Sequence, residues 1–281
     1  MPSESAAALQ QRLRDDLHSF AVPRHARWDP LGLLAVRSRL HERLAALGEV
    51  RQQAFSGGLD TGVNLILELP GREPQLPPLL VGAHYDGPLE SPGADDNASG
   101  VVALLELARR WAIDPPRRPV MLVAFDLEEW GMLGGAALAA ELRQRRQPLS
   151  LMVSLEMLAY TSDTQRYPQE AMGRLFGERG DYIALVINDG AAGLLPGLLE
   201  GMGRHVRTQA LPVADGGRDL PDVRLSDHSP FWDQGFDALM VTDTSFMRNP
   251  HYHRPSDTVD SLDLPFFAQV INGLDAALGR F

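Results

Sequence analysis

The chain has 281 residues, of which 44% are hydrophobic and 22% are charged, values typical of one folded domain. Its 37 acidic residues outnumber the 26 basic ones, and the net charge of −11 disfavours binding to nucleic acid or anionic lipid. The sequence contains no cysteine, which excludes disulfides, thiolate-bound metals and a cysteine nucleophile. Every basic residue is an arginine, so chemistry that needs a lysine amine is excluded too.

Residues 1–5 carry neither the basic region nor the apolar run of a signal peptide. No apolar stretch approaches the ~20 residues that span a bilayer. We therefore expect a cytoplasmic protein that binds neither membrane nor nucleic acid. Because the sequence shows no internal repeat or interdomain linker, we expect a single domain over residues 1–281. Residues 1–48 are expected to be an N-terminal helical extension packed on it.

Hydrophobic periodicity predicts helices and strands that alternate along the chain. Residues 30–48 have apolar side chains at helical spacing and are predicted to form an amphipathic helix that ends at Gly48. Short apolar runs predict strands at 63–69, 79–83, 119–125, 149–155, 183–187 and 238–242. Further helices are predicted after Asn97 or Ser99 and at 133–142, 194–202 and 265–278.

This alternation favours a largely parallel sheet with helices on both faces. We therefore predict an α/β fold, a three-layer α/β/α sandwich around a mostly parallel, mixed central sheet. In such folds ligands bind beyond the carboxyl ends of the strands. The residues that follow each predicted strand are therefore the candidates for function.

Acidic side chains and histidines follow four of the predicted strands. They are His84, Asp86, Asp95, Asp96, Glu128, Glu129, Glu156 and His253. Carboxylates that converge on one point repel one another unless a cation neutralises them. Imidazole mixed with oxygen ligands suits zinc or a neighbouring transition metal. The sequence therefore predicts a metal site at this edge of the sheet.

Four motifs in order resemble those of a known family. They are HYD at 84–86, GADDNASG at 93–100, EEWG at 128–131 and YHRPSDT at 252–258. The set is similar to the co-catalytic di-zinc aminopeptidases of metallopeptidase family twenty-eight, of the bacterial leucyl aminopeptidase type. The resemblance runs from about residue 63 to the C-terminus, and it implies a zinc-exopeptidase fold.

The resemblance implies two zinc ions and a ligand set. His84 and Glu156 would hold one zinc, Glu129 and His253 the other, and Asp95 would bridge both. Three protein ligands on each metal leave room for a shared water, as in catalytic zinc sites. The family most often has aspartate where this chain has Glu156, so another divalent transition metal could occupy that site.

Catalytic roles are also implied by the resemblance. Glu128 would be the general base that activates the metal-bridging water and returns the proton to the leaving amine. Asp86 would orient the His84 imidazole. Tyr252 would donate to the oxyanion of the tetrahedral intermediate. The resemblance further implies a cis peptide bond between Asp95 and Asp96.

We therefore expect a metallo-aminopeptidase that hydrolyses N-terminal residues from peptides with a free N-terminus. An acidic cleft suits a cationic amino group and favours an aminopeptidase over a carboxypeptidase. Two alternatives stay open: a glutaminyl-cyclase-type acyltransferase with one zinc, and a non-enzymatic interaction module on the same fold. The side-chain preference and the oligomeric state are left open.

The stretch 226–231 also resembles a family segment near the substrate pocket. A capped turn before a short helix explains Asp227 and His228 at least as well as contact with a substrate.

Overall fold

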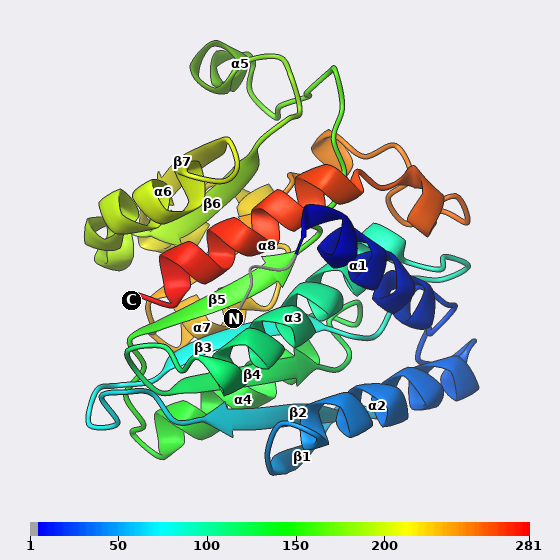
Figure 1. Ribbon diagram of the computed structural model, residues 1–281, viewed down its shortest axis with the longest axis vertical. Coiled ribbons are helices and arrows are strands. Elements are labelled where there is room, and N and C mark those ends of the chain that lie inside the picture. The colour runs from blue at the N-terminus through cyan, green and yellow to red at the C-terminus, as the bar shows by residue number, and fades with distance from the viewer. Residues whose placement is uncertain (1–4) are drawn as a thin grey trace.

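Figure 1 shows the computed structural model, which describes residues 5–281. The expected absence of a signal peptide rests on residues 1–5, of which residues 1–4 lie outside the described residues. Across residues 5–281, none of the helices has both the length and the apolar character needed to cross a bilayer.

Eight strands of the described chain form one mixed sheet in the order β1-β2-β4-β3-β5-β8-β6-β7. The neighbours β4, β3, β5 and β8 run parallel to one another. At one end of the sheet, β2 is antiparallel to both β1 and β4. At the other end, β6 is antiparallel to β8 and parallel to β7. The strands are β1 (Val50–Gly57), β2 (Asp60–Leu69), β3 (Leu79–His84), β4 (Val120–Phe125), β5 (Leu151–Glu156), β6 (Ile183–Asn188), β7 (Thr208–Val213) and β8 (Ala238–Thr242).

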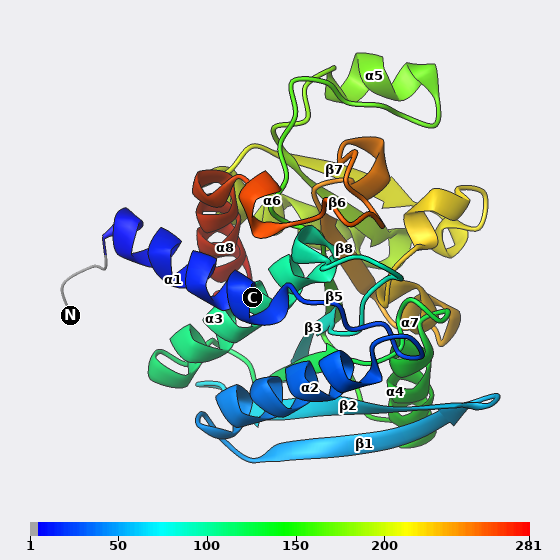
Figure 2. The same ribbon diagram turned by 90° about the vertical axis from the view of Figure 1, so that its right-hand side faces the viewer.

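Helices cover both faces of this sheet (Figures 1 and 2). One face carries α1 (Ala6–Phe20), α2 (Pro30–Ala45), α3 (Gly100–Ile113), α6 (Leu195–Gly203) and α8 (Leu264–Leu278). The other carries α4 (Leu133–Gln144) and α7 (His228–Asp233). The short helix α5 (Glu170–Phe176) sits on an arm that projects from the body. The predicted α/β architecture with a mostly parallel, mixed sheet is confirmed.

The central strands are apolar on both sides because both sides are covered. In β4, Val120, Leu122 and Ala124 belong to the core under α3 and α8, whereas Met121 and Val123 face the core under α4 and α7. Side chains that alternate along a strand point to opposite faces. The run therefore reads as continuously hydrophobic in the sequence.

Four elements were not individually predicted: α1, α5, β1 and β7. The helix α1 buries one apolar stripe of Leu9, Leu13, Leu17 and Phe20 beneath an otherwise charged surface. The strands β1 and β7 form the two edges of the sheet. Edge strands bury little surface, so their sequences carry polar residues and, in β7, Pro212.

The parallel strands place their carboxyl ends at one edge of the sheet. Three polar segments meet there: His84 ends β3, Glu156 ends β5, and the loop with Glu128 and Glu129 follows β4. In the pairing of β3 with β5, Gly82 lies opposite Ser154. Continued by two residues, this register places His84 beside Glu156.

Candidate metal centre

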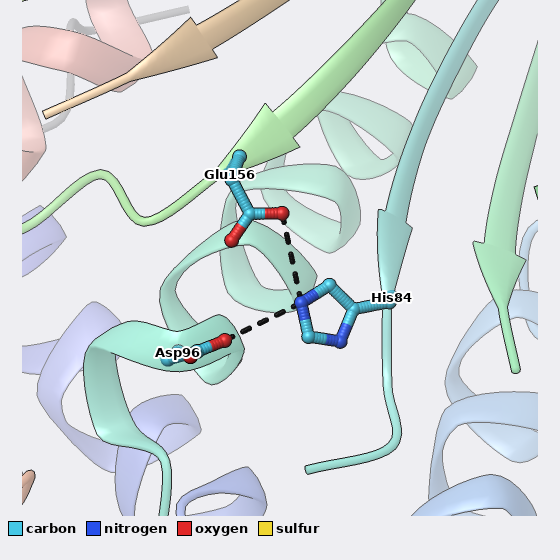
Figure 3. Close-up of side chains that lie close together, drawn as sticks. All are labelled: His84, Asp96 and Glu156. Carbon is cyan, nitrogen blue, oxygen red and sulfur yellow. Dashed lines mark ion pairs between the residues drawn. The ribbon is translucent and has the colours of Figure 1, made fainter. Parts of the chain in front are cut away.

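His84 is the centre of the first group of side chains. Its imidazole is 1% exposed, and Nε2 lies 3.4 Å from Oδ1 of Asp96 and 3.6 Å from Oε2 of Glu156 (Figure 3). Oε2 of Glu128 lies 3.9 Å from the same nitrogen. One imidazole nitrogen therefore faces three carboxylates.

His253 is the centre of a second group. Its Nε2 lies 3.0 Å from Oδ2 of Asp96 and 3.3 Å from Oε2 of Glu129. The two groups share Asp96, which turns one carboxylate oxygen to each histidine. The arrangement offers three overlapping sets of ligand atoms: His84 with Asp96 and Glu156, His253 with Asp96 and Glu129, and His84 with Glu128 and Glu129.

The position between the histidines belongs to Asp96, which corrects the expectation for Asp95. The Asp95 carboxylate accepts hydrogen bonds from the Ala159 amide at 3.0 Å and from Nδ2 of Asn249 at 2.8 Å. Its oxygens are therefore occupied by buried donors away from the histidines. The cis peptide bond likewise joins Asp96 to Asn97 instead of Asp95 to Asp96.

Further carboxyl and hydroxyl groups hold these side chains in place. Asp86 lies 3.4 Å from Nδ1 of His84 and accepts hydrogen bonds from the amides of Glu128 at 3.0 Å and Glu129 at 3.2 Å. It therefore contacts both ligand-bearing segments at once. The Ser226 hydroxyl donates to Oε2 of Glu156 at 2.7 Å.

The electrostatics of the cluster reflect its burial. Desolvation raises the pKa of Glu128 well above its usual value, and the charges of Glu156 and Asp227 raise it further, against the opposing effect of His84. Desolvation and the charge of Asp96 likewise raise the pKa of Glu129. Carboxylates in this arrangement need a positive charge to stay ionised together.

Neighbouring charges act in opposite directions on His84 and Asp96. Burial alone would lower the pKa of His84, but the charges of Glu156 and Glu128 raise it well above its usual value. For Asp96, burial would raise the pKa, but the contacts with His253 and His84 lower it. The negative charges around His84 and the imidazoles around Asp96 thus oppose the cost of burying these two groups.

The residues fit a bound metal ion. Both ring nitrogens of His84 and Oε1 of Glu129 are buried without a hydrogen-bond partner. Buried polar atoms are normally paired, so an unpaired imidazole that faces carboxylates indicates a missing partner. Two ligands about 2.1 Å from a tetrahedral zinc lie roughly 3.4 Å apart, close to the observed separations of 3.4 Å and 3.6 Å around His84.

A cavity of about 460 Å³ opens beside the cluster. Sheet residues such as Val186 and Met240 line one part of it, and Met172 and Phe176 of the α5 arm line another. Tyr252 also borders the cavity, and its ring stacks on that of His253 at 3.8 Å between centroids.

Asp227, for which a capped turn was the simpler sequence interpretation, also interacts with the cluster. It precedes α7 but makes no side-chain cap, and neither carboxylate oxygen has a hydrogen-bond partner of normal geometry. Desolvation raises its pKa well above the usual value, and the charges of Asp86 and Glu156 add to this effect. In the sequence, the one feature that pointed to a role at the site was the position of Asp227 in the stretch 226–231, which resembles a family segment near the substrate pocket.

A strand-edge site with two histidines that share a carboxylate is the kind of site that holds catalytic metals in α/β proteins. Residues 64–276 match the model of Peptidase family M28. The chain belongs to this family, and the resemblance stated from its four motifs is confirmed.

Two relatives illustrate the match. The uncharacterized protein YfbL of Escherichia coli (strain K12) is 38% identical over 218 residues, which cover 70% of this chain and 65% of that protein. The aminopeptidase YwaD of Bacillus subtilis (strain 168) is 26% identical over 66% of this chain and 36% of its own length. The chain thus spans less than two thirds of either relative.

Solved structures share the fold. The LapA aminopeptidase of Legionella pneumophila superposes with a TM-score of 0.69 at 19% identity, covering 98% of this chain and 71% of that one. A glutaminyl cyclase of Bacteroides thetaiotaomicron has a TM-score of 0.69 at 16% identity and covers 100% of this chain and 99% of its own. Because an aminopeptidase and a glutaminyl cyclase superpose with the same TM-score, the fold alone does not identify the reaction.

Substitution of the two adjacent aspartates tests the assignment. Asp96→Asn should lower the affinity for zinc by at least about tenfold, because it weakens a ligand that faces both histidines. Asp95→Asn should keep the affinity of the unmodified protein. Competition with a chromophoric chelator measures both constants. Equal losses in the two variants, or a loss confined to Asp95→Asn, would contradict the placement.

Proposed function

We propose that the protein is a metallo-aminopeptidase that hydrolyses N-terminal residues from peptides. The observation that carries the proposal is the pair of histidine and carboxylate groups that share Asp96, with Glu128 beside them and a cavity next to them. Membership of Peptidase family M28 and the similarity to the aminopeptidase YwaD support it.

Two zinc ions are the proposed cofactors. His84 and Glu156 would hold one, His253 and Glu129 the other, and Asp96 would contact both. When bound, such ions polarise a carbonyl oxygen and lower the pKa of water. A second divalent metal other than zinc is compatible with the longer side chain of Glu156.

Glu128 is the proposed general base. Its carboxylate lies beside the first group, whereas its backbone amide is held by Asp86. A carboxylate so placed can take a proton from the attacking water at Oε2 and deliver it to the nitrogen of the leaving amine. Asp86 fixes the backbone of Glu128 and faces Nδ1 of His84, so it is the proposed positioning group for both.

The charge around the cavity favours a free amino terminus. Its lining residues include carboxylates but no arginine, and the chain contains no lysine. A peptide carboxylate would therefore find no arginine or lysine side chain there, whereas an ammonium group would be attracted to the lining carboxylates. The carboxylates are Asp96, Glu128, Glu129, Glu156, Asp219 and Asp222.

A glutaminyl-cyclase-type reaction is the second candidate, because a cyclase shares this fold over the whole chain. In that reaction the N-terminal glutamine of a peptide closes on itself and releases ammonia, and the peptide keeps its length. The two reactions therefore differ in their products. A non-enzymatic module is a weaker candidate, because each ligand position carries a competent side chain.

An assay on defined peptides tests the function. Zinc-loaded protein should release the first residue from a peptide with a free N-terminus and an apolar first side chain, and it should not cleave the N-acetylated form. A chelator should abolish the reaction and zinc should restore it. Ammonia release from a glutamine-led peptide of unchanged length would favour the cyclase, and no zinc uptake at all would overturn the proposal.

The neighbours Glu128 and Glu129 should separate into two roles. Glu128→Gln should keep its zinc content and lose ~10²–10⁴-fold in kcat, because proton transfer is lost. Glu129→Gln should instead lose zinc affinity. Elemental analysis and steady-state kinetics measure the two effects, and the opposite pattern would reverse the assignment.

Tyr252 is the proposed donor to the oxyanion. Tyr252→Phe should leave zinc content and KM nearly unchanged and lower kcat on the order of 10²-fold, the cost of one such donor. Phe246 packs 5.6 Å from the Tyr252 ring, so Phe246→Leu serves as a control for disturbed packing. An unchanged kcat in Tyr252→Phe would remove the hydroxyl from the mechanism.

A further inference from the structure

Arg24 lies in the segment between α1 and α2, and its side chain is buried, with 1% exposed. Its hydrogen bonds all end on backbone carbonyl oxygens. Nε donates to the carbonyl oxygen of Tyr85 at 3.0 Å. Nη1 donates to those of Phe20 at 3.2 Å, Val22 at 3.1 Å and Pro92. Nη2 donates to those of Gly93 at 2.9 Å and Asp96 at 3.2 Å. A guanidinium group offers five N–H donors in a rigid plane, so this set fixes its orientation.

Two of the acceptors belong to the metal centre. Tyr85 stands between His84 and Asp86, and Asp96 is the residue shared by both histidines. The same guanidinium therefore holds the end of β3 and the turn that presents Asp96. Arg24 thus links these two segments by hydrogen bonds to both.

The two segments are packed directly on this side chain. A Cβ atom at Gly87 would lie 3.0 Å from Cγ of Arg24. At Gly93, where φ is +57°, a Cβ atom would lie 2.9 Å from Nη2 and 2.1 Å from the carbonyl oxygen of Asp96. The glycines allow the backbone to come close to the guanidinium.

The residues that follow Arg24 reach the third ligand-bearing segment. The guanidinium of Arg27 lies 4.3 Å from the centre of the Trp130 ring, and the His25 ring lies 5.4 Å from it. Trp130 directly follows Glu129. The stretch 24–27 therefore contacts the residue after β3, the turn with Asp96 and the loop after β4.

The charge of Arg24 also lies close to the cluster. Burial lowers the pKa of its guanidinium, and the negative charges of Asp96, Asp257, Asp86 and Glu129 oppose that shift. Arginine stays protonated in proteins. A permanent cation is thus built in behind the carboxylates.

We propose that Arg24 is a positioning residue of the metal centre, which holds the backbone of Tyr85 and Asp96 at the spacing that two adjacent metals require. Arg24 lies outside residues 64–276, the part of the chain that matches the family. The proposal rests on the metal site of the proposed function. It assigns to the N-terminal segment a part in that site beyond packing on the domain.

A purely structural role makes a different prediction. If Arg24 only anchored the N-terminal segment, its loss would destabilise the protein in the same way as any lost contact of that segment. Leu13 provides the matched control, because it is fully buried in α1 and makes none of the contacts of Arg24. Leu13→Ala weakens the same segment and leaves the six acceptors in place.

The experiment measures two quantities in each variant: zinc affinity by competition with a chromophoric chelator, and the unfolding midpoint of the metal-free protein. Arg24→Lys and Arg24→Gln should both lose zinc affinity by roughly 10–100-fold, the usual effect of residues that support metal ligands. Leu13→Ala should lower the unfolding midpoint and keep zinc affinity within about twofold, since it leaves those supports in place. Lysine should not rescue, because one ammonium cannot replace the planar set of donors.

Several results would overturn the proposal. Unchanged zinc affinity in the Arg24 variants would do so, as would a loss in Leu13→Ala of the same size. Full affinity in Arg24→Lys would assign the effect to charge instead of positioning. If the Arg24 variants do not fold, Gly87→Ala keeps the guanidinium and displaces its stem, and it should lower zinc affinity several-fold. Unmodified protein that binds no zinc would refute the proposed function itself.

Discussion

Mutual repulsion among buried carboxylates is the constraint on which this structure depends. Asp96, Glu128, Glu129 and Glu156 meet where solvent screens little charge, so the charges of Asp96 and Glu156 raise the cost of ionising Glu128 and Glu129. Only nearby cations make such a cluster stable in its ionised form. The Arg24 guanidinium behind the cluster supplies part of that charge, and a bound metal ion would supply the rest.

Some of these groups are positioned by strands and others by the segments between them. The ladder between β3 and β5 ends at Gly82 and Ser154, and the same register continued by two residues brings His84 beside Glu156. Asp96, Glu129 and His253 come from loops, whose positions depend on side chains such as Asp86 and Arg24. The backbone of the sheet therefore holds His84 and Glu156, which end strands, whereas the ligands outside the strands need hydrogen bonds from buried polar side chains to hold them.

The edge of the sheet that carries the site could be predicted because apolar runs end there in acidic residues and histidines. The choice between Asp95 and Asp96 could not, because adjacent residues of a turn point in different directions and both are aspartates. Arg24 gave no signal, since its partners are backbone carbonyls that no side-chain pattern reveals. The strands β1 and β7 were missed because edge strands lack a continuous apolar run.

The order of the strands has a consequence for how the protein can be divided. The family match begins at residue 64, inside β2, whereas β1 and both N-terminal helices precede it. A fragment that began at residue 64 would shorten β2 and remove β1 from its side. This would leave unpaired amide and carbonyl groups, which can pair with the strands of other chains. The residues that match the family therefore do not coincide with a fragment in which this edge of the sheet keeps its partner strand.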